Sequence, residues 1–318
     1  LDPHSFPTRR SSDLEVITDI LDNGFTYPDP KRKGTQRIQV PFKVIDIDVS
    51  KIPLLTTKEV NFDSIVKEFR MFISGQNNVM DLKARFWDTD AYNFYKRITN
   101  GTYSLSSFVD IVKNQRRVSI NSKDYPLVGD LGHSYPKNWY KSNQLIKAIK
   151  GVKDNHYNTD LLVLAIDINK RDSKDVALLP CHYAFQFVAT GKDSFGIVMN
   201  MRSTDVFLGL PFNAAFYFLL GEFTELVTGK KFNKLAVAMA NCHLYDNAIA
   251  EAKELIKRDT TMLSDIDFKM AFRGNVFIDF DNPQLLKDLL MVTDISIGNY
   301  NPMPKMPVKM IGQDNELL

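Results

Sequence analysis

Hydrophobic side chains recur at helical spacing in several separate stretches of the chain. Between positions 62 and 74, Ile65, Phe69 and Phe72 fall on one face of a helix, and Gly75 follows where a helix would end. Pro211 can start a second apolar helix, and Gly229 can end it. The pattern predicts helices over residues 15–23, 62–74, 105–114, 143–152, 211–227 and 243–257.

Four other segments carry the aromatic and β-branched residues that are typical of strands. They span residues 38–49, 161–168, 182–189 and 194–201, and the last three follow one another at short spacing. The predicted strands and helices do not alternate as repeated βαβ units. We therefore expect the α+β class, with these strands in one sheet.

Composition narrows the class of protein. The 318 residues are 44% hydrophobic and 25% charged, which is ordinary for a soluble globular protein, and the net charge of +2 is too small for a dedicated nucleic-acid-binding protein. With two cysteines, Cys181 and Cys242, we expect no disulfide framework and a reducing, cytoplasmic compartment. The most apolar run, residues 206–220, is too short to span a bilayer.

The ends of the chain differ from its middle. Residues 1–14 show no helical or strand period, and the string PTRRSSDL within them resembles a translated sequencing adaptor. We interpret this leader as foreign to the protein and exclude it from the fold argument, the alternative being a disordered basic arm. Residues 15–310 then form one domain with a more polar insertion at about residues 91–128, and residues 311–318 form a short polar tail.

Two strings carry candidate chemistry: LPCH at residues 179–182 and RSTD at residues 202–205. A cysteine at the start of a strand is by default a small buried hydrophobe. A neighbouring arginine changes that interpretation, because a guanidinium stabilises the thiolate and makes it a nucleophile. Two short strands separate Cys181 from Arg202, so a hairpin could bring the two side chains together.

Longer stretches around these strings resemble a known family. LPCHYAFQF, MRSTDVFLGLPFN and CHLYDN are similar to the three central motifs of thymidylate synthases and their hydroxymethylase relatives. Residues 53–69, 129–139 and 294–308 resemble further family segments, in the family's order, so the likeness spans nearly all of residues 32–310. The resemblance implies the thymidylate synthase fold: a single domain with a large mixed sheet packed by helices, dimerising through the sheet.

The resemblance assigns catalytic roles to three residues. Cys181 would attack C6 of a pyrimidine nucleotide, and Glu68 would organise water and shuttle protons. Tyr135 matches a tyrosine implicated in removing the C5 proton. Without the motifs, Glu68 would be a solvent-facing helix carboxylate and Tyr135 an ordinary half-buried aromatic.

The resemblance also assigns the nucleotide-binding residues. Asn213 would read the base, since a side-chain amide offers both a donor and an acceptor to N3–H and O4 of uracil. His243 and Tyr245 match the pair that binds the sugar 3′-hydroxyl.

The 5′-phosphate has its own set of residues. It would be held by Arg202 and Ser203, with Arg32 from a basic loop as a second clamp.

On the folate side, three residues match family positions. Trp87 would pack against the co-substrate, Asp205 would bind the pterin ring, and Lys58 would meet the glutamyl tail. The implied co-substrate is 5,10-methylenetetrahydrofolate, with no metal ion. The family's C-terminus closes over the site, and here its equivalent near Met310 is followed by the extra residues 311–318.

The main departure from the family lies at residues 159–160. Family members carry an arginine pair there that grips the partner subunit's phosphate, whereas this chain has Thr159 and Asp160. Three explanations remain open: a substrate that carries its phosphate differently or lacks it, replacement by other cations, or loss of catalysis. The candidate replacements are the pairs 116–117 (Arg116, Arg117) and 170–171 (Lys170, Arg171).

Two smaller departures bear on the reaction. Met201 stands where synthases usually have glutamine and some hydroxymethylases have methionine, and Asn241 replaces a commonly acidic residue. We favour reductive methylation of dUMP to dTMP by a homodimer that needs neither membrane nor nucleic acid. The alternatives are a dUMP or dCMP hydroxymethylase and a non-catalytic nucleotide- or RNA-binding homologue.

Overall fold

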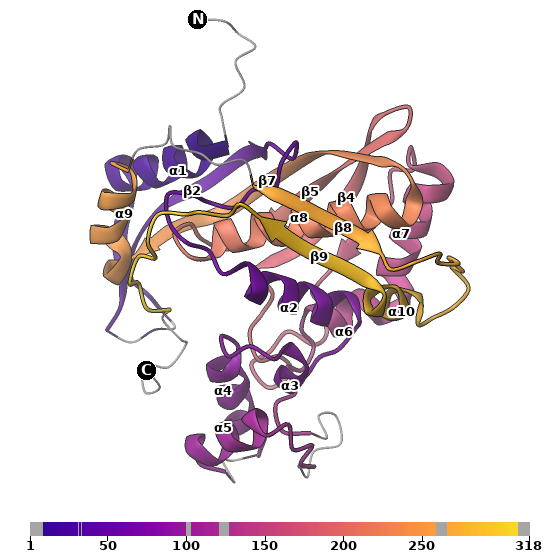
Figure 1. The fold of residues 1–318 in the computed structure, drawn as a ribbon. Helices are drawn as coiled ribbons and strands as arrows, with labels where there is room; N and C mark the ends of the chain where they lie inside the picture. Colours follow the sequence, from indigo (N-terminus) through magenta and orange to yellow (C-terminus); the bar gives the residue numbers. More distant parts are fainter. Residues whose placement is uncertain are drawn as a thin grey trace, which may run out of the picture.

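A mixed β-sheet forms one layer of the protein, and helices cover one of its faces (Figure 1). The computed structural model describes residues 9–30, 32, 34–99, 103–120, 127–258 and 266–310. The strands of the main sheet are β1 (Phe25–Pro28), β2 (Gln36–Ile47), β3 (Leu162–Leu164), β4 (His182–Gly191), β5 (Ser194–Met201), β6 (Thr204–Asp205) and β7 (Lys231–Tyr245). A separate antiparallel pair consists of β8 (Asp267–Phe272) and β9 (Thr293–Gly298).

The strand order is β1-β2-β7-β5-β4-β3, with β6 also paired to β7. The β5–β7 and β6–β7 pairs are parallel and the other pairs are antiparallel. The α+β class and the large mixed sheet are thereby confirmed. The strand expected over residues 161–168 is shortened to the three residues of β3, while β2, β4 and β5 match their predicted positions closely.

The helices lie mainly on one side of the sheet and in a lobe beyond it (Figure 1). They are α1 (Arg9–Asn23), α2 (Phe62–Ile73), α3 (Val79–Leu82), α4 (Asp88–Thr99), α5 (Leu105–Lys113), α6 (Tyr135–Tyr140), α7 (Gln144–Asn155), α8 (Gly209–Thr228), α9 (Ile249–Leu255) and α10 (Leu285–Met291). The short helices α3, α4 and α5 form the lobe, which spans much of the predicted insertion.

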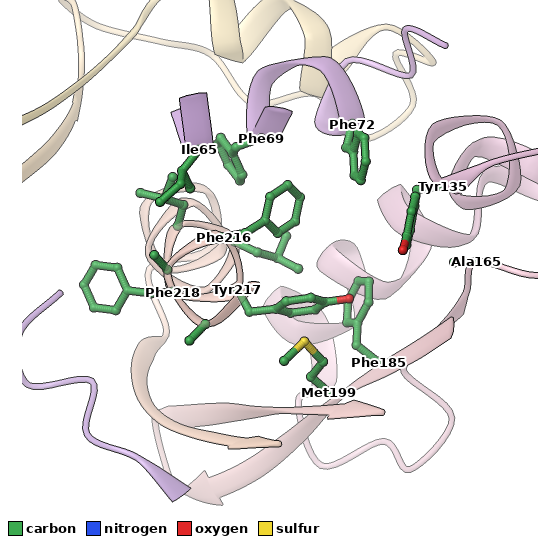
Figure 2. Close-up of a cluster of buried hydrophobic side chains, with 14 of the residues drawn as sticks. Ile65, Phe69, Phe72, Tyr135, Ala165, Phe185, Met199, Phe216, Tyr217 and Phe218 are labelled. Carbon is green, nitrogen blue, oxygen red and sulfur yellow. The ribbon is translucent and has the colours of Figure 1, made fainter. Parts of the chain in front are cut away.

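Helix α8 is the centre of the hydrophobic core. It lies between α2 and the sheet, as Figure 2 shows, and this explains why its sequence is apolar on nearly every side. On one side Phe216 meets Phe69 of α2, with ring centroids 5.7 Å apart. On the other side Tyr217 reaches Phe185 of β4 at 5.5 Å.

Helix α2 forms as its sequence predicts. The side chain of Asn61 caps its first turn by accepting a hydrogen bond from Ser64 N at 2.9 Å. After the helix, Gly75 adopts a φ of +71°, a conformation that favours glycine. The buried face of α2 includes Phe69, Phe72 and, among its polar residues, Glu68.

Two expectations for the second half of the chain were wrong. Residues 243–245 belong to the end of β7 instead of starting a helix, and only α9 remains of the helix expected up to residue 257. Strand β7 itself was missed, because Ala236, Ala238 and Ala240 give it little β-propensity. Its pairing on both sides, with β2 and with β5, makes it a strand nevertheless.

The N-terminal helix is longer than expected. It begins at Arg9 instead of residue 15, and the side chains of Val16, Ile17 and Ile20 join the core. An ion pair of 2.8 Å between Asp19 and Lys43 ties it to β2. The interpretation of residues 1–14 as a foreign leader stays a prediction, and residues 1–8 and the tail 311–318 lie outside the described residues.

One face of the main sheet carries exposed hydrophobic residues. The strand register places Val44, Ala238, Asn200, Ala184 and Leu164 in one row across this face. Val44 is 68% exposed and Leu164 is 43% exposed. No helix within the described ranges is long and apolar enough to cross a membrane.

Candidate active site

The β4–β5 hairpin brings Cys181 and Arg202 together, as the sequence predicts. Cys181 immediately precedes β4 and Arg202 immediately follows β5, and Arg202 N donates to the carbonyl oxygen of Cys181 at 2.9 Å. The guanidinium of Arg202 donates through Nε to Pro180 O at 2.9 Å and through Nη2 to Leu179 O. Its Nη2 lies 3.7 Å from Cys181 Sγ, so a fixed positive charge stands beside the thiol.

The electrostatic surroundings of Cys181 are mixed. Burial raises the pKa of its thiol, while Arg202 and then Arg32 act in the opposite direction. Asp90 and Asp205 add smaller contributions that raise the pKa again. The two arginines thus favour the thiolate at a position where enclosure by the protein opposes it.

Tyr135 contacts the segment that carries Cys181. The backbone N–H of Cys181 donates to the Tyr135 hydroxyl oxygen at 2.7 Å. The Tyr135 ring stacks on His182, with centroids 4.1 Å apart, and on Phe72 at 4.9 Å. Burial raises the pKa of Tyr135 well above its usual value, so the phenol keeps its proton at neutral pH.

Glu68 is buried instead of facing solvent. Its side chain comes from α2, and its Oε1 accepts a hydrogen bond from Trp87 Nε1 at 2.7 Å. Burial raises the pKa of Glu68 to about 7, and the hydrogen bond from Trp87 works in the opposite direction. The carboxyl group can therefore both give and take a proton near neutral pH.

His182 contributes a neutral imidazole, a feature that the sequence did not reveal. Burial lowers its pKa to about 3, and its Nδ1 lies 3.0 Å from the hydroxyl of Tyr217 on α8. Tyr217 was not predicted as a site residue, because it lies within a long apolar run. The only available sign was a tyrosine among phenylalanines, since a buried hydroxyl needs a partner.

His243 and Tyr245 lie side by side at the end of β7. Their ring centroids are 4.9 Å apart, and the Arg32 guanidinium lies 5.0 Å from the Tyr245 ring centroid. His243 Nδ1 lies 2.8 Å from the carbonyl oxygen of Asn241, so Nδ1 carries the proton and donates. Burial lowers the pKa of His243, and its buried Nε2 makes no hydrogen bond within the described part of the chain.

Asp205 and Asn213 come together across the first turn of α8. The position that a Cβ would occupy at Gly209 lies 3.5 Å from Asp205 Cβ and 3.9 Å from Asn213 Nδ2. Asp205 Oδ1 accepts hydrogen bonds from the backbone N–H groups of Phe207 and Leu208, both at 3.0 Å. Ser203, partly exposed, lies in the link from β5 to β6 beside Arg202.

The two remaining folate-side residues have well-defined partners. Lys58 is 4% exposed, and its Nζ donates to the carbonyl oxygen of Phe207. Burial lowers the pKa of Lys58 to about 8. Trp87 gives its indole N–H to Glu68. The assignment of Lys58 to a glutamyl tail and of Trp87 to the co-substrate stays a prediction, and Lys58 directs its ammonium inward in this conformation.

Three of the four cations considered as replacements for the arginine pair form ion pairs elsewhere in this chain. Arg116 pairs with Asp110, and Arg117 pairs with Asp81 at 2.6 Å, both within the helical lobe. Lys170 lies 3.8 Å from Asp175. These ion pairs offer no support for a role of Arg116, Arg117 or Lys170 at the phosphate.

Comparison with known proteins identifies the family of this chain. A family model described as thymidylate synthase matches residues 13–311. The chain belongs to the thymidylate synthase family. Curated thymidylate synthases include one from Malacoplasma penetrans, 28% identical over 93% of this chain and 98% of the relative. One from Mycoplasma pneumoniae is 33% identical over 86% and 97% of the two chains, and one from Listeria monocytogenes is 29% identical over 93% and 99%.

Membership of the thymidylate synthase family places this chain among enzymes that transfer a one-carbon unit. The family uses methylenetetrahydrofolate as its co-substrate in general. The binding of this co-substrate by Asp205 and Trp87 stays a prediction.

Proposed function

We propose that this chain is a thymidylate synthase that methylates dUMP at C5, with 5,10-methylenetetrahydrofolate supplying the carbon and the hydride. The observation that carries the proposal is the 3.7 Å approach of Arg202 Nη2 to Cys181 Sγ, at a point where Tyr135 also contacts the Cys181 backbone. The thymidylate synthases among the relatives favour methylation over hydroxymethylation.

The first step belongs to Cys181 and Asn213. The Cys181 thiolate forms a bond to C6 of the uracil, and the electron pair of the C5–C6 double bond moves toward O4. The Asn213 amide can donate to O4 as negative charge develops there and accept from N3–H. C5 thereby becomes nucleophilic and takes the one-carbon unit.

The next steps need proton transfer at C5. Once C5 carries its new substituent, the C5 proton leaves, and the electron pair that it releases expels the tetrahydrofolate nitrogen from the one-carbon unit. The co-substrate would then supply a hydride to the exocyclic methylene. The bond between Cys181 and C6 breaks as the C5–C6 double bond forms again, which returns the thiolate. Glu68, whose pKa is about 7, accepts the C5 proton directly or through a water that it holds. The protonated Tyr135 hydroxyl holds Cys181 by accepting a hydrogen bond from its backbone N–H. His182 is neutral and contributes no charge to these steps.

We further propose that the chain acts as a homodimer whose subunits meet through the open face of the main sheet. Phe42 and Val44 of β2 are 72% and 68% exposed, and Leu162 and Leu164 of β3 are 42% and 43% exposed. Exposed apolar side chains of this size on both sides of a sheet face are typical of a protein interface. A second copy would present the same surface in return.

Product analysis by mass spectrometry tests the reaction. The purified protein is mixed with dUMP and 5,10-methylenetetrahydrofolate, and we expect dTMP together with dihydrofolate. Cys181→Ala should abolish the product, whereas Cys242→Ala, which alters the buried cysteine in β7, should retain it. A hydroxymethylated product would transfer the assignment to the hydroxymethylases. No product from the native protein with dUMP, dCMP or deoxyuridine would refute the proposed reaction.

A further inference from the structure

Arg37 is a charged residue on the nucleotide side of the sheet that none of the assignments above uses. It lies on β2 directly opposite Tyr245 of β7, and two residues further along Gln39 lies opposite His243. Because alternate residues of a strand share one face, Arg37 projects from the same face as His243 and Tyr245. Its charge also acts on the pKa of His243, together with that of Arg32.

A single buried carboxylate joins Arg37 to Arg32. The Nη1 atoms of both arginines face the same oxygen, Asp29 Oδ2, at 3.5 Å from Arg37 and 3.6 Å from Arg32. The Asp29 side chain is 2% exposed, whereas those of Arg37 and Arg32 are 15% and 18% exposed. Asp29 thus lies between the two guanidinium groups, at ion-pair distance from both.

The surroundings of Arg37 fix its orientation and leave it able to bind an acceptor. Its guanidinium lies 4.8 Å from the ring centroid of Tyr27, which holds the plane of the group. Its Nε is buried and makes no hydrogen bond to any residue in the described part of the chain. A buried guanidinium N–H normally has an acceptor, so this donor points to an anionic ligand.

A chain of side chains links this arginine pair to Arg202. The Tyr27 hydroxyl donates to Gln39 Oε1, and Gln39 Nε2 donates to Asn241 Oδ1 at 3.4 Å. Asn241 Nδ2 donates to the backbone carbonyl oxygen of Arg202 at 2.8 Å. The distance between the two groups of arginines is therefore set by the ends of adjacent strands.

We propose that Arg37 and Arg32, held as a pair by Asp29, form a second arm that binds the nucleotide phosphate opposite Arg202. Guanidinium groups bind phosphate oxygens well, and a phosphate monoester carries about −1.5 to −2 at pH 7. Asp29 is a positioning residue, and Arg37 is a binding residue. The inference rests on the proposed function, because it takes the nucleotide to be dUMP.

Calorimetric binding of dUMP and of 2′-deoxyuridine to the full chain tests the assignment. For Arg37→Gln we expect dUMP binding about 10- to 100-fold weaker than for the native protein, because a charge-assisted hydrogen bond is lost. Deoxyuridine, which lacks the phosphate, should bind equally to both. Arg37→Lys keeps the positive charge but lacks the planar guanidinium that can make two parallel hydrogen bonds. It should give an intermediate loss of dUMP affinity. Arg273→Gln, at an exposed ion pair with Asp294, is the matched control and should bind as the native protein does.

The outcomes separate this inference from the proposed function. The role of Arg37 is overturned if Arg37→Gln binds dUMP as tightly as the native protein does. It is also overturned if both Arg37 variants lose dUMP and deoxyuridine binding equally. Either result leaves the proposed reaction standing. A selective loss of dUMP binding in a protein that yields no dTMP supports the phosphate arm and refutes the reaction. A native protein that binds no dUMP refutes both.

Discussion

At the scale of single residues, burial decides what Glu68 can do. A carboxylate on a helix is ordinarily ionised at neutral pH, yet enclosure raises the pKa of Glu68 to about 7. The hydrogen bond from Trp87 Nε1 partly counteracts that effect by favouring the charged form. Trp87 and Glu68 therefore act as a unit in setting the pH range of proton transfer.

Removal of the Trp87 hydrogen bond should move this pH range upward. In Trp87→Phe the ring remains but the N–H that stabilises the Glu68 carboxylate is lost, so the Glu68 pKa should rise by about one unit. We expect the limb of the kcat/KM profile that lies near pH 7 to shift to higher pH. An unchanged limb would show that a group other than Glu68 is titrating.

Glu68 should also cost the protein stability at high pH. Its folded pKa of about 7 exceeds the ordinary value of 4.5, so the folded state binds the proton more tightly and stability falls as the pH rises from 4.5 through 7. The full effect is about 3 kcal/mol. Glu68→Gln should therefore unfold at a higher temperature than the native protein at pH 8, with little difference at pH 5, and lose at least about 100-fold in kcat. Equal melting temperatures at pH 8 would contradict the raised pKa.

At the scale of elements, α8 connects the core to the site. Its first turn carries Asn213, its middle carries Tyr217 against His182, and its far end packs on the start of β7. The close approach there depends on Gly221, where an added Cβ would lie 2.4 Å from the Phe232 ring. The position of Asn213 thus depends on packing about two turns away along the same helix.

Two glycines of α8 give a matched test of that packing. Gly221→Ala forces Phe232 to move and should destabilise the protein by about 1–3 kcal/mol. Gly209→Ala places its Cβ 3.5 Å or more from its neighbours and should keep or slightly raise stability, since alanine is the better helix former. Denaturant unfolding of the two variants checks this, and equal midpoints would contradict the proposed role of Gly221.

At the scale of the whole molecule, the exposed sheet face carries the proposed homodimer. The strand register places Val237, Met199 and Phe185 against the helices. Val44, Ala238 and Leu164, one position along their strands from that row, lie on the opposite face. A sheet covered on one face only leaves an apolar surface, and a second copy of the chain would bury it.

A charge introduced on that face should separate the subunits. Phe42→Asp changes a side chain that is 72% exposed, so the single chain should fold as before. The dimer should dissociate at least about 100-fold more readily, because the interface would bury an unpaired charge. Phe277→Asp, at an 87% exposed phenylalanine outside the sheet, is the control. Sedimentation velocity distinguishes the species, and a Phe42→Asp protein that remains a native-sized dimer would refute this interface.

The sequence by itself determined the local features of this protein. Helix α2, the β4–β5 hairpin and the pairing of Cys181 with Arg202 follow from spacing and turn residues close in the chain. The resemblance of whole motifs also identified the family. The helix and the hairpin depend on geometry between residues close in the chain, which periodicity and local residue types predict.

Only the tertiary structure decided which residues are buried and what they contact. Strand β7 exists because β2 and β5 pair with it, although its alanines favour no strand. The pKa of Glu68, the neutral His182 against Tyr217 and the sharing of Asp29 by Arg32 and Arg37 all arise from groups far apart in sequence. Dehydration and long-range pairing depend on the folded surroundings, and no local pattern in the chain contains them.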